Sequence, residues 1–504
     1  MHARKILETG TLYEPFSFRR MASYGGQSFL HALLLVFAPI GQLNLLDKGV
    51  CRLAVAIALV AYVLARPNRS LAAVLVVVYA VFAYQDIALN TASLFSGVLA
   101  FVGLWMTLEF CRSEGVGPIP KGILTGLVAA GTLPLRQNYG LACALVVCLE
   151  HASRFRTARD PRQAKELLCA ALAAALCVGG WALLQLHSCG TPLFPLLRGY
   201  ANPQWDVLAA GSLDAYWTAV ASCLRWPLIS VQLGLAALAL LRLDRSHDAA
   251  GLRPLAAAAL LAFAGNVWLL GHISSPADLA RYATAFLLPV VLFGSARSAE
   301  ALARVRSATA LRDWRIWLCG AFLLALLWIL PPVKRISERV LILRAEIEAI
   351  PRFPDYAGWA LRYTRLQSAV PPGETLLVML DDPYLLDLRR NDIVSLDLPG
   401  GVSPPPGLWA IGSPREVVGY LRGLGYSWLA AVRPERAPSW SFYELERWTS
   451  RANGTPDDAA WRVMGQTALR LFGQLDEIVQ SCRLTFEDGH LVVIDLAKCR
   501  FDPS

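Results

Sequence analysis

Three charged side chains lie at the ends of apolar runs, where ionisable groups are rare and are functional candidates. Asp86 ends an apolar run in the sequence YQDIALN, where its carboxylate could act as a general base or metal ligand. Arg136 lies in a turn between two apolar runs, and Arg281, followed by Tyr282, lies where a loop enters the next run. Guanidinium groups in such places can bind a phosphate through two hydrogen bonds. The residue types therefore predict a carboxylate that serves as a base or metal ligand, and arginines that bind lipid phosphate.

Each of these residues also has a structural interpretation, which the sequence leaves open. Asp86 could be a helix-end carboxylate in interfacial water, with Asn90 one helical turn further on. The arginines could extend to lipid headgroups, and Arg281 could instead pair with Asp278 at i,i+3 spacing on a helix.

A polar loop at residues 189–206 separates two apolar runs and is rich in aromatic side chains. Arg198, Tyr200, Asn202 and Trp205 lie in it. Aromatic rings pack on sugars and on isoprenoids, so the loop is a candidate binding segment. An aromatic belt at a membrane interface is the alternative.

The elements that position these residues are apolar. The chain has 504 residues, of which 55% are hydrophobic and only 17% are charged, too few charges for a soluble enzyme of this length. Its 15 Trp, 15 Tyr and 19 Phe exclude intrinsic disorder. Ten apolar runs are candidate membrane spans, at 50–65, 71–88, 93–110, 122–135, 139–150, 166–187, 226–241, 254–271, 282–296 and 314–331.

Loop charges predict the orientation of these runs. The net charge of +9 comes mainly from Arg and Lys in alternate loops, which favours membrane topology signals over nucleic-acid binding. These loops are predicted to be cytoplasmic, so ten crossings leave both termini outside. Residues 28–46 are then an interfacial helix interrupted at Pro39 and Gly41, with an eleventh span as the alternative.

The composition changes after Pro332. Residues 333–504 are predicted to form a small outer α/β domain, whereas 1–49 form outer juxtamembrane segments and 50–332 the membrane core. Helices are predicted at 341–350, 356–366 and 413–425, and strands at 374–380, 392–398, 426–432 and in a hairpin at 483–496. Cys482 and Cys499 bracket the hairpin, and a disulfide is expected if this domain faces an oxidising compartment.

Four segments are similar to one family of membrane enzymes. They are residues 2–33, YQDIALN at 84–90, the loop GTPLFPLLRGYANP at 190–203 and DLARYATAFLLP at 278–289. The third resembles a G-N-P-x-x-P loop in which Thr191 replaces Asn. With these segments the chain resembles the GT-C-type integral membrane glycosyltransferases, a bacterial class that includes protein mannosyltransferases and the aminoarabinose transferases of lipid A.

The resemblance implies both a fold and a function. The fold is a polytopic α-helical membrane protein with about ten transmembrane helices and a C-terminal α/β domain on the outer side of the bacterial inner membrane. The function is transfer of a hexosyl or pentosyl group from a polyprenyl-phosphate donor to a lipid, glycan or protein acceptor. Membrane lipid is a further partner. The resemblance assigns no certain cofactor, and a divalent metal is possible, since some branches of the family use one.

The family's roles extend to matching residues of this chain. Asp86 is the expected base near the acceptor, and the arginines with Tyr282 are expected at the donor phosphate. The donor-phosphate candidates are Arg136, Arg198, Arg281 and Tyr282, and the substrate-binding candidates are Asn90, Asn138 and Asn202.

The family's usual base is a carboxylate of the first outer loop, before a stretch matched here by Ala3 to Gly10. Because Met1 immediately precedes that stretch, the resemblance places this carboxylate outside the given sequence. The start could be assigned too far downstream, or the chain could be an inactive member. Glu14 is the substitute base that proximity suggests. Two other function classes stay open: a lipid-linked sugar flippase or transporter, and a non-catalytic partner in cell-envelope glycan assembly.

Overall fold

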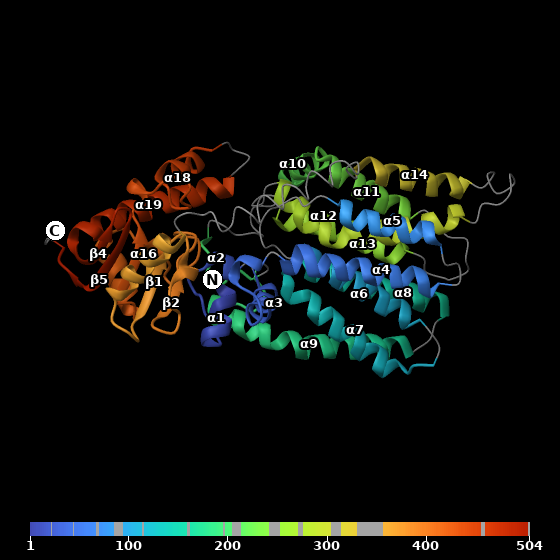
Figure 1. The fold of residues 1–504 in the computed structure, drawn as a ribbon, viewed down its shortest axis with the longest axis horizontal. Coiled ribbons are helices and arrows are strands. Elements are labelled where there is room, and N and C mark those ends of the chain that lie inside the picture. The colour runs from blue at the N-terminus through green and yellow to red at the C-terminus, as the bar shows by residue number, and fades with distance from the viewer. Residues whose placement is uncertain are drawn as a thin grey trace. The chain divides into compact units, whose positions relative to one another are not determined.

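The computed structural model describes residues 1–21, 23–43, 45–66, 70–84, 94–112, 115–158, 162–194, 197–203, 213–240, 252–270, 276–303, 314–329, 356–454 and 459–501. The chain forms two compact units (Figure 1). The first contains Met1–Leu33, Ala182–Ala210 and Ile347–Ser504, and the second contains Leu34–Trp181 and Gly211–Glu346. The N-terminal segment and the C-terminal domain, predicted as separate parts, thus share one unit.

The second unit is helical, and each predicted apolar run contains a helix. Its α-helices are α4 (Arg52–Ala65), α5 (Leu71–Ala83), α6 (Phe95–Phe110), α7 (Pro118–Thr132), α8 (Tyr139–Ala158), most of α9 (Arg162–Cys189), α10 (Leu213–Leu224), α11 (Pro227–Ala239), α12 (Arg253–Leu270), α13 (Pro276–Ala303) and α14 (Trp314–Ile329). A π-helical turn, η2 (Leu46–Cys51), leads into α4, and a short 3₁₀ turn, η3 (Leu133–Leu135), follows α7. The helix α10 was not predicted.

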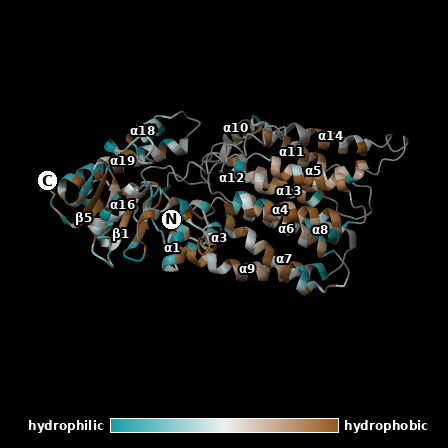
Figure 2. Cartoon of the chain, viewed as in Figure 1, coloured by the Kyte–Doolittle hydropathy of each residue, from teal (hydrophilic) through white to brown (hydrophobic). Residues whose placement is uncertain are grey.

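Length and apolar composition identify three helices, within the described residues, that could cross a membrane. They are Leu46–Ala65, Arg162–Cys189 and Leu279–Ala303. The pair Tyr216–Leu224 and Pro227–Ala239, bent by 98°, makes a fourth if it is one span. Figure 2 shows hydrophobic colour along much of these helices. Shorter apolar helices lie in four further runs, at Leu71–Ala83, Phe95–Phe110, Arg253–Leu269 and Ile316–Leu326, so ten crossings stay a prediction.

Two glycines one turn apart let α7 pack closely on α9. An ideal Cβ at Gly122 would lie 2.3 Å from the carbonyl oxygen of Glu166, and one at Gly126 would lie 2.4 Å from that of Ala170. Small residues at i and i+4 are typical of membrane helices whose backbones approach closely. The spacing Gly-x-x-x-Gly therefore sets the distance between these two helices.

The segment 28–46 contains the predicted interruption. The helix α3 (Gly26–Leu35) ends before Pro39, and a short 3₁₀ turn, η1 (Ile40–Gln42), follows. Proline removes a backbone donor and clashes with a preceding turn, which explains the end of α3. Val36 and Phe37 are 55% and 87% exposed at this break. Such exposure suits lipid contact, and the interfacial position stays a prediction.

The first unit contains a five-stranded mixed sheet in the order β2-β1-β3-β5-β4 (Figure 1). The strands are β1 (Thr375–Met379), β2 (Asp392–Ser395), β3 (Trp428–Val432), β4 (Cys482–Asp488) and β5 (Leu491–Cys499). β1 pairs in parallel with β2 and β3, whereas β5 is antiparallel to both β3 and β4. All five strands agree with the predicted segments.

Helices of the C-terminal domain cover this sheet. α17 (Pro414–Gly423) begins with the capping box of Ser413 and Glu416. Together with α19 (Ala459–Ser481) it covers the face that carries Leu377 of β1 and Leu429 of β3. α16 (Tyr356–Ser368) matches its prediction, whereas α18 (Leu445–Ala452) and α19 were not predicted. The predicted helix at 341–350 lies outside the described residues.

The N-terminal segment packs into the same unit. It contains α1 (His2–Thr9), which ends at Gly10 with φ 70°, and α2 (Phe18–Met21). Phe16 is fully buried in the core of the C-terminal domain. Asp397 accepts hydrogen bonds from the Ser17 hydroxyl at 2.6 Å and the Phe18 N–H at 2.9 Å. Apolar burial and a buried carboxylate thus join the two ends of the chain.

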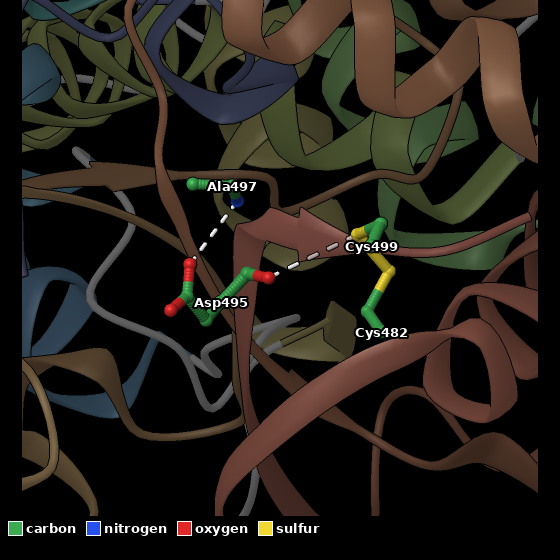
Figure 3. The surroundings of a disulfide bond; sticks show 4 residues. All are labelled: Cys482, Asp495, Ala497 and Cys499. Carbon is green, nitrogen blue, oxygen red and sulfur yellow. Dashed lines mark hydrogen bonds between the residues drawn. A yellow bond between two sulfur atoms is a disulfide. The ribbon is translucent and has the colours of Figure 1, made fainter.

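The Cys482–Cys499 disulfide forms, with an S–S distance of 2.02 Å (Figure 3). It links the start of β4 to the end of β5, so it closes the hairpin. In Figure 3 the backbone N–H of Ala497 donates to Asp495 Oδ1 at 3.1 Å beside it. Disulfides persist in oxidising compartments, so the bond is consistent with an extracytoplasmic C-terminal domain.

Candidate functional site

Two of the predicted phosphate-binding arginines meet on one tyrosine ring in the second unit. The guanidinium carbon of Arg136 lies 4.7 Å from the ring centroid of Tyr282, and that of Arg281 lies 4.9 Å from it. Arg281 Nη2 also donates to the Tyr282 hydroxyl at 3.1 Å. We call Arg136, Arg281 and Tyr282 the arginine–tyrosine cluster.

A glycine explains why these residues meet although they are far apart in the chain. An ideal Cβ at Gly97 of α6 would lie 2.8 Å from Cε2 of Tyr139 and 3.0 Å from Cβ of Ala285. Tyr139 begins α8 three residues after Arg136, and Ala285 follows Arg281 by one turn of α13. The close approach of α8 and α13 to α6 at this glycine therefore brings their first turns, and both arginines, together.

The turn that carries Arg136 is held by backbone hydrogen bonds. The carbonyl of Arg136 accepts from the Tyr139 N–H at 3.1 Å, and that of Gln137 accepts from the Gly140 N–H at 3.0 Å. Arg136 itself has extended backbone (φ −157°, ψ 140°) after η3. The guanidinium is thus presented from a fixed turn between two helices.

The cluster concentrates positive charge and planar hydrogen-bond donors. Stacking on an aromatic face stabilises a guanidinium group and restricts its orientation. Two guanidinium groups beside one ring repel each other, and an anion that bridges them removes that repulsion. The arrangement is therefore suited to a phosphate.

Two buried amides add donors in this unit. Asn138 Nδ2 and Asn266 Nδ2 are buried, and neither has a hydrogen-bond partner within the described residues. Asn138 lies in the same turn as Arg136, whereas Asn266 lies on α12 and is 3% exposed. A buried donor without a partner costs about 1–3 kcal/mol, so such groups are candidates for substrate contacts. Asn138 was predicted and Asn266 was not.

A buried polar chain adjoins the cluster. Gln232 Nε2 donates to the Tyr84 hydroxyl at 2.6 Å, and Thr284 Oγ1 lies 3.3 Å from the same oxygen. Thr284 is one helical turn from Arg281 on α13, so the two share a face. Tyr84 precedes Asp86 by two residues, whereas Asp86 and Asn90 themselves lie outside the described residues. The sequence signal for Gln232 was a single amide within an apolar run.

Another missed residue is Asp47, which caps α6. Its carboxylate accepts from the N–H groups of Leu94, Phe95 and Ser96 at 3.2, 3.1 and 2.8 Å. An acidic group at a helix N-terminus accepts hydrogen bonds from the free N–H groups and interacts favourably with the helix dipole. Asp47 therefore holds the first turn of the helix that carries Gly97.

Arginines that were predicted only as topology signals are also ion-paired. Arg112 Nε lies 2.7 Å from Glu150 Oε1, and Arg297 Nη2 lies 2.5 Å from Glu109 Oε1. Both Arg297 Nη2 and Arg66 Nη1 donate to the Tyr62 hydroxyl, at 3.1 and 2.6 Å. The acidic partners were missed because each lies alone within an apolar or mixed run.

The remaining predicted residues belong to the first unit. Arg198 is exposed in the loop after α9. Asn202 is 1% exposed, and its backbone N–H donates to the carbonyl of Gly401 at 2.9 Å. Gly190 and Gly199 of this loop have φ of 71° and 57°, which L side chains rarely adopt. The loop is thus built into the unit of the C-terminal domain.

Glu14 does not occupy the position expected of a catalytic base. It is fully buried, its Oε1 lies 3.0 Å from Lys5 Nζ, and its Oε2 accepts from the Ser395 N–H at 2.7 Å. An acceptor hydroxyl has no access to a fully buried carboxylate, so this geometry argues against the predicted role. The ion pair instead joins the N-terminal segment to β2.

The buried Glu14 predicts a pH dependence of stability. Burial raises the pKa of Glu14 from 4.5 to about 7, and Lys5 partly offsets the increase. Because the folded state holds this proton more tightly than the unfolded state, stability is expected to fall as the pH rises from 4.5 to about 7. Above that window this contribution is constant.

The measurement is thermal unfolding of the full chain at several pH values, for the wild type and for Glu14→Gln. Glutamine keeps an acceptor for the Ser395 N–H but does not titrate. The difference in Tm between the two proteins should change across the window. Parallel curves would show that Glu14 does not titrate there.

Among the described residues, no group of three or more His, Cys, Asp or Glu side chains is placed to hold a metal ion. No protein-family model and no curated protein matches the chain. The functional argument therefore rests on the site itself.

Proposed function

We propose that the protein is a membrane glycosyltransferase of the GT-C type. It moves a sugar from a polyprenyl-phosphate donor to a lipid, glycan or protein acceptor at the outer face of the bacterial inner membrane. The meeting of Arg136 and Arg281 on Tyr282 carries the proposal. The sugar leaves from a phosphate that gains negative charge, and fixed guanidinium groups stabilise such charge.

Several observations support the proposed topology of about ten spans with an outer C-terminal domain. The N-terminal segment, the loop after α9 and the C-terminal domain form one unit, which supports the proposal that all three lie on the same side of the membrane. The pairing of Ala201 with Val402 joins the loop to the domain. Charge bias in the sequence assigns all three segments to the outer side. The disulfide fits an oxidising compartment.

The proposed base is Asp86, which has to reach the acceptor hydroxyl. Its neighbour in the chain, Tyr84, contacts α13 one turn from Arg281. A carboxylate close to Tyr84 would act beside the proposed phosphate site. Arg198 belongs to the first unit, and its predicted role at the donor phosphate stays a prediction.

The test uses purified protein in lipid nanodiscs and measures two quantities. The first is binding of a polyprenyl phosphate, and the second is sugar transfer from a panel of polyprenyl-phosphate sugars. Arg281→Ala and Arg136→Ala are each expected to weaken phosphate binding about 10- to 100-fold, the effect of losing a charge-assisted hydrogen bond. Arg225→Ala is the matched control, since Arg225 is an exposed arginine in another predicted outer loop. Asp86→Asn is expected to abolish transfer and to leave binding intact.

The outcomes separate the function classes. Transfer that depends on both arginines and on Asp86 supports the enzyme. Arginine-dependent binding without transfer favours a flippase or a non-catalytic assembly partner. Binding that is unchanged in both arginine variants would exclude the arginine–tyrosine cluster as the phosphate site.

A further inference from the structure

The sheet of the C-terminal domain has a place where ligands often bind. After β1 the chain passes to β2 on one side, and it later returns to β3 on the other side. In open α/β sheets such a switch point leaves a crevice outside the carboxyl ends of the two strands. The segments there are 380–382 after β1 and 433–442 after β3.

Aromatic rings from three parts of the domain meet at this edge. Trp359 of α16 lies 5.4 Å from Trp440, which follows β3, between ring centroids. His490 immediately precedes β5, and its backbone carbonyl accepts from the Arg433 N–H at 2.7 Å. The imidazole of His490 stacks on Trp359 at 5.7 Å and meets Trp440 edge-on at 6.2 Å. We call Trp359, Trp440 and His490 the aromatic platform.

The platform has one solvent-exposed ring and one buried polar atom without a hydrogen-bond partner among the described residues. Trp440 is 56% exposed, although a large aromatic side chain gains much by burial. His490 is 8% exposed, and its Nε2 is buried without a hydrogen-bond partner among the described residues. The imidazole contacts both platform tryptophans, so its ring belongs to the cluster. A buried polar atom without a partner is a candidate for a ligand contact.

Polar groups surround the rings. Asp382 Oδ2 accepts from Trp359 Nε1 at 2.9 Å, which fixes that indole. The guanidinium of Arg362 lies 4.9 Å from the Trp359 ring centroid and is paired with Asp488 at 2.8 Å. Carboxylate oxygens remain acceptors after one such bond, and a guanidinium has several donors. The edge thus combines an aromatic face with both donors and acceptors.

The chemistry of the edge excludes some ligand classes. Asp381 and Asp382 follow β1 directly, where nucleotide-binding folds have a glycine-rich turn that binds phosphate. Two carboxylates repel a phosphate at that position. Cations are also disfavoured, since Arg362 already lies over Trp359. A neutral ring with many hydroxyl groups satisfies both the aromatic face and the polar groups.

We propose that the aromatic platform binds a neutral pyranose, which stacks on the exposed ring of Trp440 and hydrogen-bonds to His490 Nε2 and Asp382. This would be a second saccharide site, in the C-terminal domain of the first unit. The proposal does not depend on sugar transfer, because its test measures only the binding of a sugar.

The test uses the full chain in lipid nanodiscs and saturation-transfer NMR with methyl β-glucoside, methyl α-mannoside and N-acetylglucosamine. At least one of them should bind saturably, with a Kd on the order of 1 mM for so small a ligand. Trp440→Ala should weaken this binding at least about 10-fold, whereas Trp440→Phe keeps a ring and should retain most of it. Leu424→Ala is the matched control, because Leu424 is exposed to 39% outside the platform.

Three results would overturn the proposal. The first is no saturable binding of any of the three sugars. The second is binding that Trp440→Ala leaves unchanged. The third is choline or inorganic phosphate binding at the platform in preference to the sugars, which would assign it to a charged ligand. Since none of these readouts involves the arginine–tyrosine cluster, failure here is distinct from failure of the proposed transferase.

Discussion

Lys5→Met is expected to lower the free energy of unfolding of the first unit by about 3–5 kcal/mol at about pH 8, where Glu14 is ionised in the wild type. Lys5 is 1% exposed, and its Nζ contacts Glu14 Oε1 at 3.0 Å, the carbonyl of Tyr13 at 2.9 Å and the carbonyl of Ile393 at 2.6 Å. Methionine fills a similar volume but supplies none of these bonds. The variant would leave the buried Glu14 carboxylate without its counter-charge and remove one donor from each of the two carbonyl groups.

The measurement is denaturant unfolding of the full chain in detergent, followed by tryptophan fluorescence. Lys498→Met is the matched control, since the Lys498–Asp495 pair at 3.3 Å involves a lysine that is 58% exposed. An exposed pair of this kind contributes about 0–1 kcal/mol. Equal effects of the two substitutions would contradict the structural role of Lys5.

A double variant separates the ion pair from the packing around it. Replacing Lys5 by methionine and Glu14 by leucine removes both charges, which is often close to neutral for a buried pair. Recovery of most of the lost stability would show that the cost arises from the uncompensated charge. No recovery would instead assign the cost to the two carbonyl groups and to side-chain packing.

Gly126→Leu is expected to destabilise the second unit by about 3 kcal/mol, the upper end of the usual range for overpacking. A Cβ at this position would lie 2.4 Å from the carbonyl oxygen of Ala170 and 2.7 Å from Cβ of Ala173. Both contacts involve α9, one of the helices long enough to cross the membrane. Because backbone atoms cannot rotate away, the two helices have to separate.

The same helix contains the control for this prediction. Gly131 of α7 is exposed, and a Cβ there meets nothing within 4 Å. Gly131→Leu should therefore leave stability within about 0.5 kcal/mol. Thermal unfolding in detergent, read by the loss of the monodisperse peak in size exclusion, compares the two variants. A similar loss in both would show that side-chain volume on α7 is not limited by α9.

Much of the secondary structure followed from local sequence patterns. Each apolar run contains a helix, and all five strands lie in segments with alternating or apolar patterns. Ser413 predicts the start of α17 because an N-cap hydrogen bond is local. The helices α10, α18 and α19 were not predicted, although α18 and α19 are amphipathic at the helical period. The number of membrane crossings stays a prediction, since several helices are shorter than a full span.

The candidate site could be predicted only residue by residue. Arg136 and Arg281 were recognised separately, since a charge next to an apolar run is visible in the sequence. Their meeting on Tyr282 depends on the close packing of α8 and α13 across Gly97, which no local pattern contains. Glu14 differs from the arginines. Its position in the sequence suggested a catalytic base, whereas its burial against Lys5 gives it a structural role.

The sequence by itself determined the apolar helices, the strands, the charge bias of the loops and the candidate arginines, because each depends on residues close together in the chain. Only the tertiary structure decided that the N-terminal segment, the loop after α9 and the C-terminal domain form one unit. It also decided that two arginines share one ring, and that Trp359, Trp440 and His490 meet at the edge of a sheet. The physical reason is that burial and close packing select partners that are distant in sequence, and local patterns do not encode them.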